Sequence, residues 1–174
     1  IYCGEDCECQ PPQPLLWNGI FHPRADRTFT DSGQYRRLFC RPDRPTVGVI
    51  FFRDEWIWSD LAHQAALIGE IERQDMNALA VFSHWGRNTE YNAPGVDDTV
   101  RTYFYENGWP VIDVLINTIK FSLTVGRPGD QDFLRRLGVP VLQAYSLLWP
   151  YREWMDSIES MTAMEVSVSV TMPE

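Results

Sequence analysis

Hydrophobic positions change their spacing in a regular order after residue 45. The stretch Val47–Phe52 is almost continuously apolar, which is typical of a strand buried on both faces of a parallel sheet. Residues 61–74 instead repeat apolar side chains at helical spacing, and residues 77–85 form a second apolar run. The pattern therefore predicts a strand, a helix and another strand in succession.

The alternation continues towards the end of the chain. In order, we expect a helix over Val96–Asn107 that ends at Gly108, a strand over 111–117, a short helix over 131–138, a strand over 139–146, a helix or turn over 149–158, and a strand over 164–172 whose strict alternation leaves one face polar. Strands separated by helices favour parallel pairing, with helices on both faces of the sheet. The predicted fold class is three-layer α/β with a mainly parallel sheet, Rossmann-like or flavodoxin-like.

Residues 1–45 differ from the rest because Pro, Gly and Arg are scattered there without a sustained apolar period. We expect an irregular, Pro- and Arg-rich arm over 1–45 that lies on an α/β domain over 46–174. The total length suits one domain with a sizeable core.

Charge and composition exclude several classes of partner. The formal net charge is −9, and no run of basic residues offers the footprint of a nucleic-acid backbone. No apolar run approaches the roughly 20 residues needed to span a bilayer, and no secretory signal is recognisable at Ile1. We expect a cytoplasmic, soluble protein without nucleic acid or membrane partners.

Cysteine and histidine residues are weak candidates for metal binding. Four thiols could hold zinc or an iron–sulfur cluster, but their spacing lacks the paired two-residue gaps of a zinc ribbon, so free thiols are the main expectation: Cys3, Cys7, Cys9 and Cys40. His84 follows the second strand and is the best placed imidazole for a metal. His63 is expected in the core on the apolar face of its helix, and His22 is expected to fix a turn through a backbone hydrogen bond.

Ligands of open parallel sheets bind beyond the carboxyl ends of the strands. The side chains expected there are mixed aromatic, acidic and cationic, and the candidates for substrate binding are Arg53, Trp56, Asn117 and Tyr145. Two interpretations stay open for the first two. Arg53 could bind a substrate carboxylate or pair with Asp54, Asp60 or Glu90, and Trp56, like Trp58, could stack on a ligand or pack the arm onto the sheet.

Several sequence blocks resemble one family. "GIFHP", "VGVIFFRDEW", "NALAVFS", "VIDVLINTIKFSL", "LGVPVLQAYS" and "MEVSVSVTMPE" occur in the order seen in the large (H-type) subunit of the cobaltochelatase and magnesium chelatase family. The chain resembles a fragment from the N-terminal half of that subunit. The segment "HWGRNTEYNAPG" departs from the family pattern, which puts the role of His84 in doubt.

The resemblance implies a function. The full subunit would bind a tetrapyrrole and insert cobalt or magnesium as a substrate, with ATP used by separate AAA+ type motor subunits, and the fragment would hold no cofactor and be inactive alone. Glu174 matches the family's Pro-Glu glutamate, which is implicated in catalysis. "GVPVLQAYS" leans towards the cobalt type, although the residue chemistry does not exclude magnesium. The alternatives are a flavodoxin-like binding module, which the bulky "RDEWIWSD" disfavours, and a purely structural α/β domain.

Overall fold

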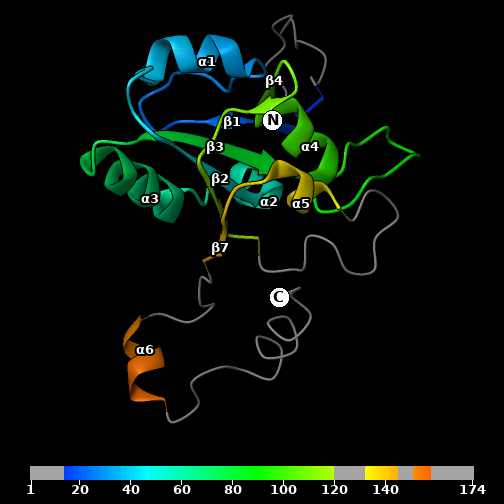
Figure 1. The fold of residues 1–174 in the computed structure, drawn as a ribbon. Helices are drawn as coiled ribbons and strands as arrows, with labels where there is room; N and C mark the ends of the chain where they lie inside the picture. Colours follow the sequence, from blue (N-terminus) through cyan, green and yellow to red (C-terminus); the bar gives the residue numbers. More distant parts are fainter. Residues whose placement is uncertain (1–13, 120–131, 145–150, 158–174) are drawn as a thin grey trace, which may run out of the picture.

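The computed structural model describes residues 14–119, 132–144 and 151–157, and a mixed sheet forms the centre of this part (Figure 1). Its five strands have the order β1-β3-β2-β6-β7. Their bounds are β1 Asn18–Phe21, β2 Thr46–Phe52, β3 Asn77–Ser83, β6 Val114–Asn117 and β7 Val141–Gln143. All neighbouring pairs are parallel except β1 with β3, which confirms the mainly parallel sheet.

Helices cover both faces of this sheet, as predicted for a three-layer fold. One buried cluster joins the sheet to α1 (Ser32–Phe39), α4 (Val96–Tyr103) and α5 (Phe133–Leu137). The other joins the opposite face to α2 (Arg53–Ile57) and α3 (Ala62–Arg73). In Figure 1, α1 and α3 lie on opposite sides of the strands. The short helix α6 (Tyr151–Asp156) has no buried residue.

Strand β2 explains why its sequence is apolar without a break. Val47, Val49 and Phe51 enter the α3 cluster, whereas Ile50 enters the α1 and α4 cluster. A side chain at Gly48 would meet Ile112 at 2.7 Å, so glycine allows close packing there. Both faces of β2 are therefore buried.

Part of the predicted irregular arm is regular structure. Residues 18–21 form β1, an outermost strand of the sheet, and residues 32–39 form α1, whose Tyr35 is fully buried. The expectation of irregular structure was wrong over these two elements because β1 has only four residues and the apolar stripe of α1 is short. The boundary between arm and domain at residues 45 and 46 stays a prediction.

The helix predicted over Val96–Asn107 is too long. Helix α4 ends at Tyr103, and a hairpin follows, made of β4 (Tyr105–Glu106) and β5 (Trp109–Pro110). Asn107 and Gly108 both have positive φ, at 51° and 83°, which is the backbone of a two-residue hairpin turn. Gly108 therefore serves the hairpin turn and does not end the helix.

Two edges of the sheet matter below. We call the side where the parallel strands end the carboxyl edge and the side where they begin the amino edge.

The strand predicted over 164–172 lies outside the described residues. Within the described part, no helix is long and apolar enough to cross a membrane.

Candidate functional site

The topology points to one place on the carboxyl edge. The chain passes from β2 to β3 on one side and later returns to β6 on the other side of β2, so the connections diverge between β2 and β6. A crevice at such a switch point is the usual ligand site of open α/β sheets. Helix α2 directly follows β2, and Thr118 directly follows β6.

In this protein, side chains of the chain itself occupy that position. Gln64, which is fully buried, donates from Nε2 to Thr118 Oγ1 at 2.9 Å and to Glu55 Oε2 at 3.0 Å. Thr118 donates in turn to the carbonyl of Ile50 at 3.2 Å. Gln64 Oε1 is buried without a hydrogen-bond partner. The network ties α2, α3 and β6 together where a ligand crevice was expected.

His63 does not lie in the core, so that prediction was wrong. Its ring is 40% exposed, and Nε2 lies 3.1 Å from Glu55 Oε2. Helix α3 begins at Ala62 and buries Gln64, Ile68 and Ile71, which turns position 63 outwards. The prediction failed because the polar residue on the buried face of α3 is Gln64, the neighbour of His63.

Arg53 is buried and bonds to the N-terminal arm. Its Nε donates to the carbonyl of Leu16 at 2.6 Å, and its guanidinium carbon lies 4.2 Å from the centre of the Trp17 ring. Burial lowers the pKa of Arg53 below its usual value. Within the described residues Arg53 forms no ion pair, so the predicted alternatives with Asp54, Asp60 or Glu90 are not seen. Its guanidinium group bonds to backbone carbonyls instead. Its role in substrate binding stays a prediction.

Trp56 packs inwards, whereas Trp58 faces solvent. The Trp56 ring stacks on Phe82 at 4.4 Å between centroids, and its Nε1 donates to Thr28 Oγ1 at 3.2 Å. Trp56 therefore joins the arm to the sheet, in the packing role that was one of its two interpretations. Trp58 is 79% exposed, so a partner can reach it.

Asn117 and His84 also bond to the protein. Asn117 donates to Gln143 Oε1 at 2.6 Å and accepts from the backbone of Ile119 at 3.0 Å. His84 Nδ1 lies 2.7 Å from the carbonyl of Gly86, and its ring meets the edge of Trp17. Their roles in substrate and metal binding are untested.

The remaining candidates divide by location. Tyr145, Glu174, Cys3, Cys7 and Cys9 lie outside the described residues. Cys40 is a free thiol, half-buried, and burial raises its pKa to about 11. Among the described residues, no group of three or more His, Cys, Asp and Glu side chains could hold a metal ion.

His22 confirms its predicted turn. Its Nδ1 accepts from the backbone of Arg24 at 3.2 Å, and its carbonyl accepts from Ala25 at 3.0 Å. The Nε2 atom, which is then the donor, lies 3.2 Å from Glu72 Oε1. Burial lowers the pKa of His22 below its usual value, against the opposing effect of the Glu72 hydrogen bond.

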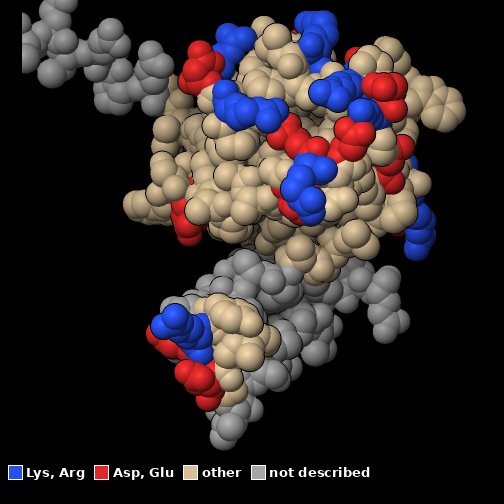
Figure 2. All heavy atoms as spheres, turned by 90° about the vertical axis from the view of Figure 1, so that its left-hand side faces the viewer, with Lys and Arg blue, Asp and Glu red and all other residues tan. Residues whose placement is uncertain are grey.

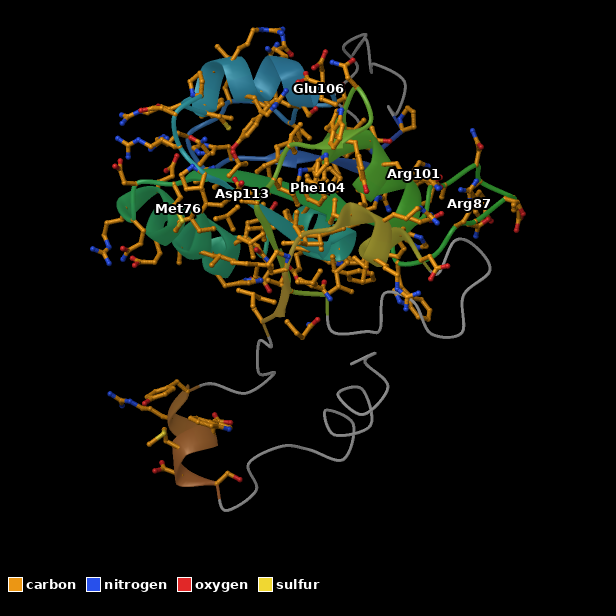
Figure 3. The ribbon with its side chains drawn as sticks, in the orientation of Figure 1. Met76, Arg87, Arg101, Phe104, Glu106 and Asp113 are labelled. Carbon is orange, nitrogen blue, oxygen red and sulfur yellow. The ribbon has the colours of Figure 1, made fainter. Side chains whose placement is uncertain are left out.

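A large cavity lies at the amino edge, opposite the carboxyl edge where ligand binding was predicted. It has a volume of about 950 Å³ and is bounded by α1, the loop after α1 and the segment that follows the hairpin. Arginines line it, and Figure 2 shows basic side chains gathered with acidic ones on this face. Figure 3 shows Asp113, which lines the cavity, on the opposite side of the molecule from Arg87.

Sequence reasoning missed this cavity because the strand-end rule directs attention to the carboxyl edge. The sequence did offer one signal, the high density of arginine in "RRLFCRPDR" (Arg36, Arg37, Arg41 and Arg44). Without the fold, this composition is typical of an ordinary surface loop. Helix α1 and the start of β2 bring these positions to one side of the sheet.

The chain is similar to chelatase subunits along its length. A family model described as CobN/Magnesium Chelatase matches residues 1–174. An uncharacterised protein of Methanocaldococcus jannaschii is 29% identical over 96% of this chain and 14% of its own length. The chloroplastic magnesium-chelatase subunit ChlH of Oryza sativa subsp. indica is 26% identical over 98% of this chain and 13% of its own.

A solved structure shares the fold. The catalytic subunit of cobaltochelatase from Mycobacterium tuberculosis superposes with a TM-score of 0.65 at 16% identity, over 96% of this chain and 13% of that subunit. The chain thus spans a small part of the relatives that it matches. Because the family model covers every residue from 1 to 174, the chain belongs to the CobN/magnesium chelatase family.

Proposed function

We propose that this chain is an α/β domain of the large, tetrapyrrole-binding subunit of an ATP-dependent metal chelatase. The observation that carries the proposal is the family match over residues 1–174. This chain carries no Gly-x-x-x-x-Gly-Lys loop. The use of ATP by separate AAA+ type motor subunits rests on the resemblance to the family. The complete subunit acts in the cytoplasm and takes the divalent metal as substrate. Cobalt insertion is the preferred reaction, on the resemblance of "GVPVLQAYS", with magnesium as the alternative.

Metal insertion requires a base that removes two pyrrole protons. Glu174 is the proposed base because it stands in the Pro-Glu sequence that resembles the family's catalytic motif. Contact with an apolar macrocycle would raise the pKa of a carboxylate towards the range of a useful base. The remaining parts of the subunit are needed to enclose the tetrapyrrole.

The test uses the full-length subunit with its motor partners, ATP, metal and tetrapyrrole. Glu174→Gln is expected to abolish insertion while tetrapyrrole binding stays within about tenfold, or ~1.4 kcal/mol. Glu165→Gln, in the same segment, removes the same charge and is the matched control that keeps insertion. Wild-type rates in Glu174→Gln would remove the assignment.

A second function, a purely structural domain, is favoured by one observation. Arg53, Asn117 and Gln64, at the predicted ligand edge, are bonded to the protein itself. Both functions predict that the isolated chain does not insert metal, so turnover by this chain alone would refute both. They differ in the full-length subunit, where only the chelatase domain predicts that Glu174→Gln abolishes metal insertion.

A further inference from the structure

The cavity at the amino edge combines guanidinium groups with an apolar wall. Its guanidinium groups come from Arg36, Arg37, Arg41 and Arg44. At about 950 Å³ it lies near the upper end of the range of roughly 300–1,000 Å³ that holds small ligands. Only those of its charges that are not already compensated can attract a ligand.

The carboxylates of the cavity are engaged. Glu106 Oε2 lies 2.6 Å from Arg36 Nη2, and Asp113 Oδ2 accepts from the backbone of Thr46 at 2.7 Å. Asp43 lies 3.7 Å from Arg44 Nε, and Arg44 also pairs with Asp75 beside the cavity. Glu106 and Asp43 therefore pair with Arg36 and Arg44, whereas Asp113 keeps its negative charge and bonds to the backbone of Thr46.

Arg37 and Arg41 keep their charge available. Both are exposed, and within the described residues no carboxylate lies within ion-pair distance of Arg37. The Arg41 guanidinium is 4.0 Å from Asp75, whose carboxylate already pairs with Arg44. In addition, the Nε–H of Arg36 is buried without an acceptor. This side of the cavity therefore carries a surplus of donors in a chain whose net charge is −9.

The surrounding surface selects the kind of anion. Pro42, Pro45, Pro110 and Val111 form apolar lining beside the arginines. The N-terminus of α1 is capped by Asp31, which accepts from the backbone of Gln34 at 2.8 Å, so it offers no open cradle for phosphate. Separate guanidinium groups next to apolar surface suit carboxylates carried on a hydrophobic body.

We propose that this cavity binds a small molecule that carries several carboxylates on an apolar body, with Arg37 and Arg41 as the carboxylate-binding residues. A tetrapyrrole carboxylic acid has this chemistry, and choosing it as the occupant rests on the proposed function. The ligand then approaches the amino edge and not the carboxyl edge that strand topology favours.

The test is calorimetric titration of the 174-residue chain with two probes, uroporphyrin and benzenehexacarboxylate. The double variant Arg37→Gln/Arg41→Gln is expected to raise both dissociation constants at least about tenfold. The matched control Arg135→Gln/Arg152→Gln removes the same charge from exposed sites outside the cavity and is expected to stay within about twofold. Because Arg37 and Arg41 are exposed, both variants should fold, which thermal unfolding checks.

Three results would contradict the proposal. If neither probe binds saturably, or if both double variants lose equal affinity, the site is overturned. Binding of benzenehexacarboxylate without uroporphyrin would overturn the tetrapyrrole as its occupant. None of these results decides the chelatase function, which the Glu174→Gln measurement on the full subunit tests separately.

Discussion

The carboxyl and amino edges of the sheet use their polar side chains differently. At the carboxyl edge Arg53 bonds to the carbonyls of Leu15 and Leu16, and Gln64 joins Glu55 to Thr118. At the amino edge Arg37 and Arg41 remain exposed beside a cavity of about 950 Å³. The comparison shows that a side chain at a strand end lies where ligands usually bind. Whether it can bind one depends on the hydrogen bonds that it already makes within the protein.

The largest expected effect is on the stability of the carboxyl edge. Phe82→Ala removes a fully buried ring that stacks on Trp56 and contacts Phe51, and should lower the free energy of unfolding by about 3–5 kcal/mol. Urea denaturation measures this loss. Arg37→Gln/Arg41→Gln, at the amino edge, should change stability by less than about 0.5 kcal/mol. Comparable losses in the two variants would break the contrast between the edges.

Cys40 reports on the amino-edge cavity through its reactivity. Its pKa of about 11, against 9.0 for an ordinary thiol, reduces the thiolate about 100-fold at pH 8. Alkylation by iodoacetamide, followed by mass spectrometry in a Cys3→Ser/Cys7→Ser/Cys9→Ser background, should be slower by this factor than in the unfolded chain. Bound uroporphyrin should slow it further. Alkylation at the unfolded rate would show that the cavity wall is not packed as described.

Arg53→Met tests whether the arginine is structural. The change leaves two backbone carbonyls without their donor and should cost about 1–3 kcal/mol, with faster hydrogen exchange in residues 14–21. Uroporphyrin affinity should stay within about twofold. Affinity lost in proportion to Arg37→Gln/Arg41→Gln would support the predicted role of Arg53 in substrate binding.

The smallest effect concerns pH. Because the folded state lowers the pKa of His22, its unfolded form binds a proton first as the pH falls. The contribution of neutral His22 to stability is complete above pH 6.5 and is lost as the pH falls from there towards the folded pKa. The slope from this residue is at most about 1.4 kcal/mol per pH unit.

His22→Asn keeps an acceptor for the backbone of Arg24 and removes the titration. Denaturation curves should therefore fall less steeply below pH 6.5 in the variant than in the wild type, with the neighbouring Glu72 and Arg24 unchanged in both. Parallel curves would mean that His22 does not titrate differently in the folded state.

Periodicity predicted the central elements well because β2, α3 and β3 are long and uniform. It missed β1, which has only four residues, and it extended α4 through a hairpin although Asn107-Gly108 is a recognisable turn sequence. The candidate site was harder to predict. The structure places Arg53, Trp56 and Asn117 at or just after the carboxyl ends of β2 and β6. Their partners Leu16, Thr28 and Gln143 are distant in sequence, so these hydrogen bonds follow only from the tertiary structure.

Hydrogen exchange measured by mass spectrometry, with and without uroporphyrin, tests the contrast between the edges most directly. The account predicts protection in residues 36–45 and 106–113, around the cavity, and no change in residues 53–60 and 84–91 at the carboxyl edge. The control Arg135→Gln/Arg152→Gln should give the same map, and Arg37→Gln/Arg41→Gln should lose it. Protection confined to residues 53–60 and 84–91 would contradict the account.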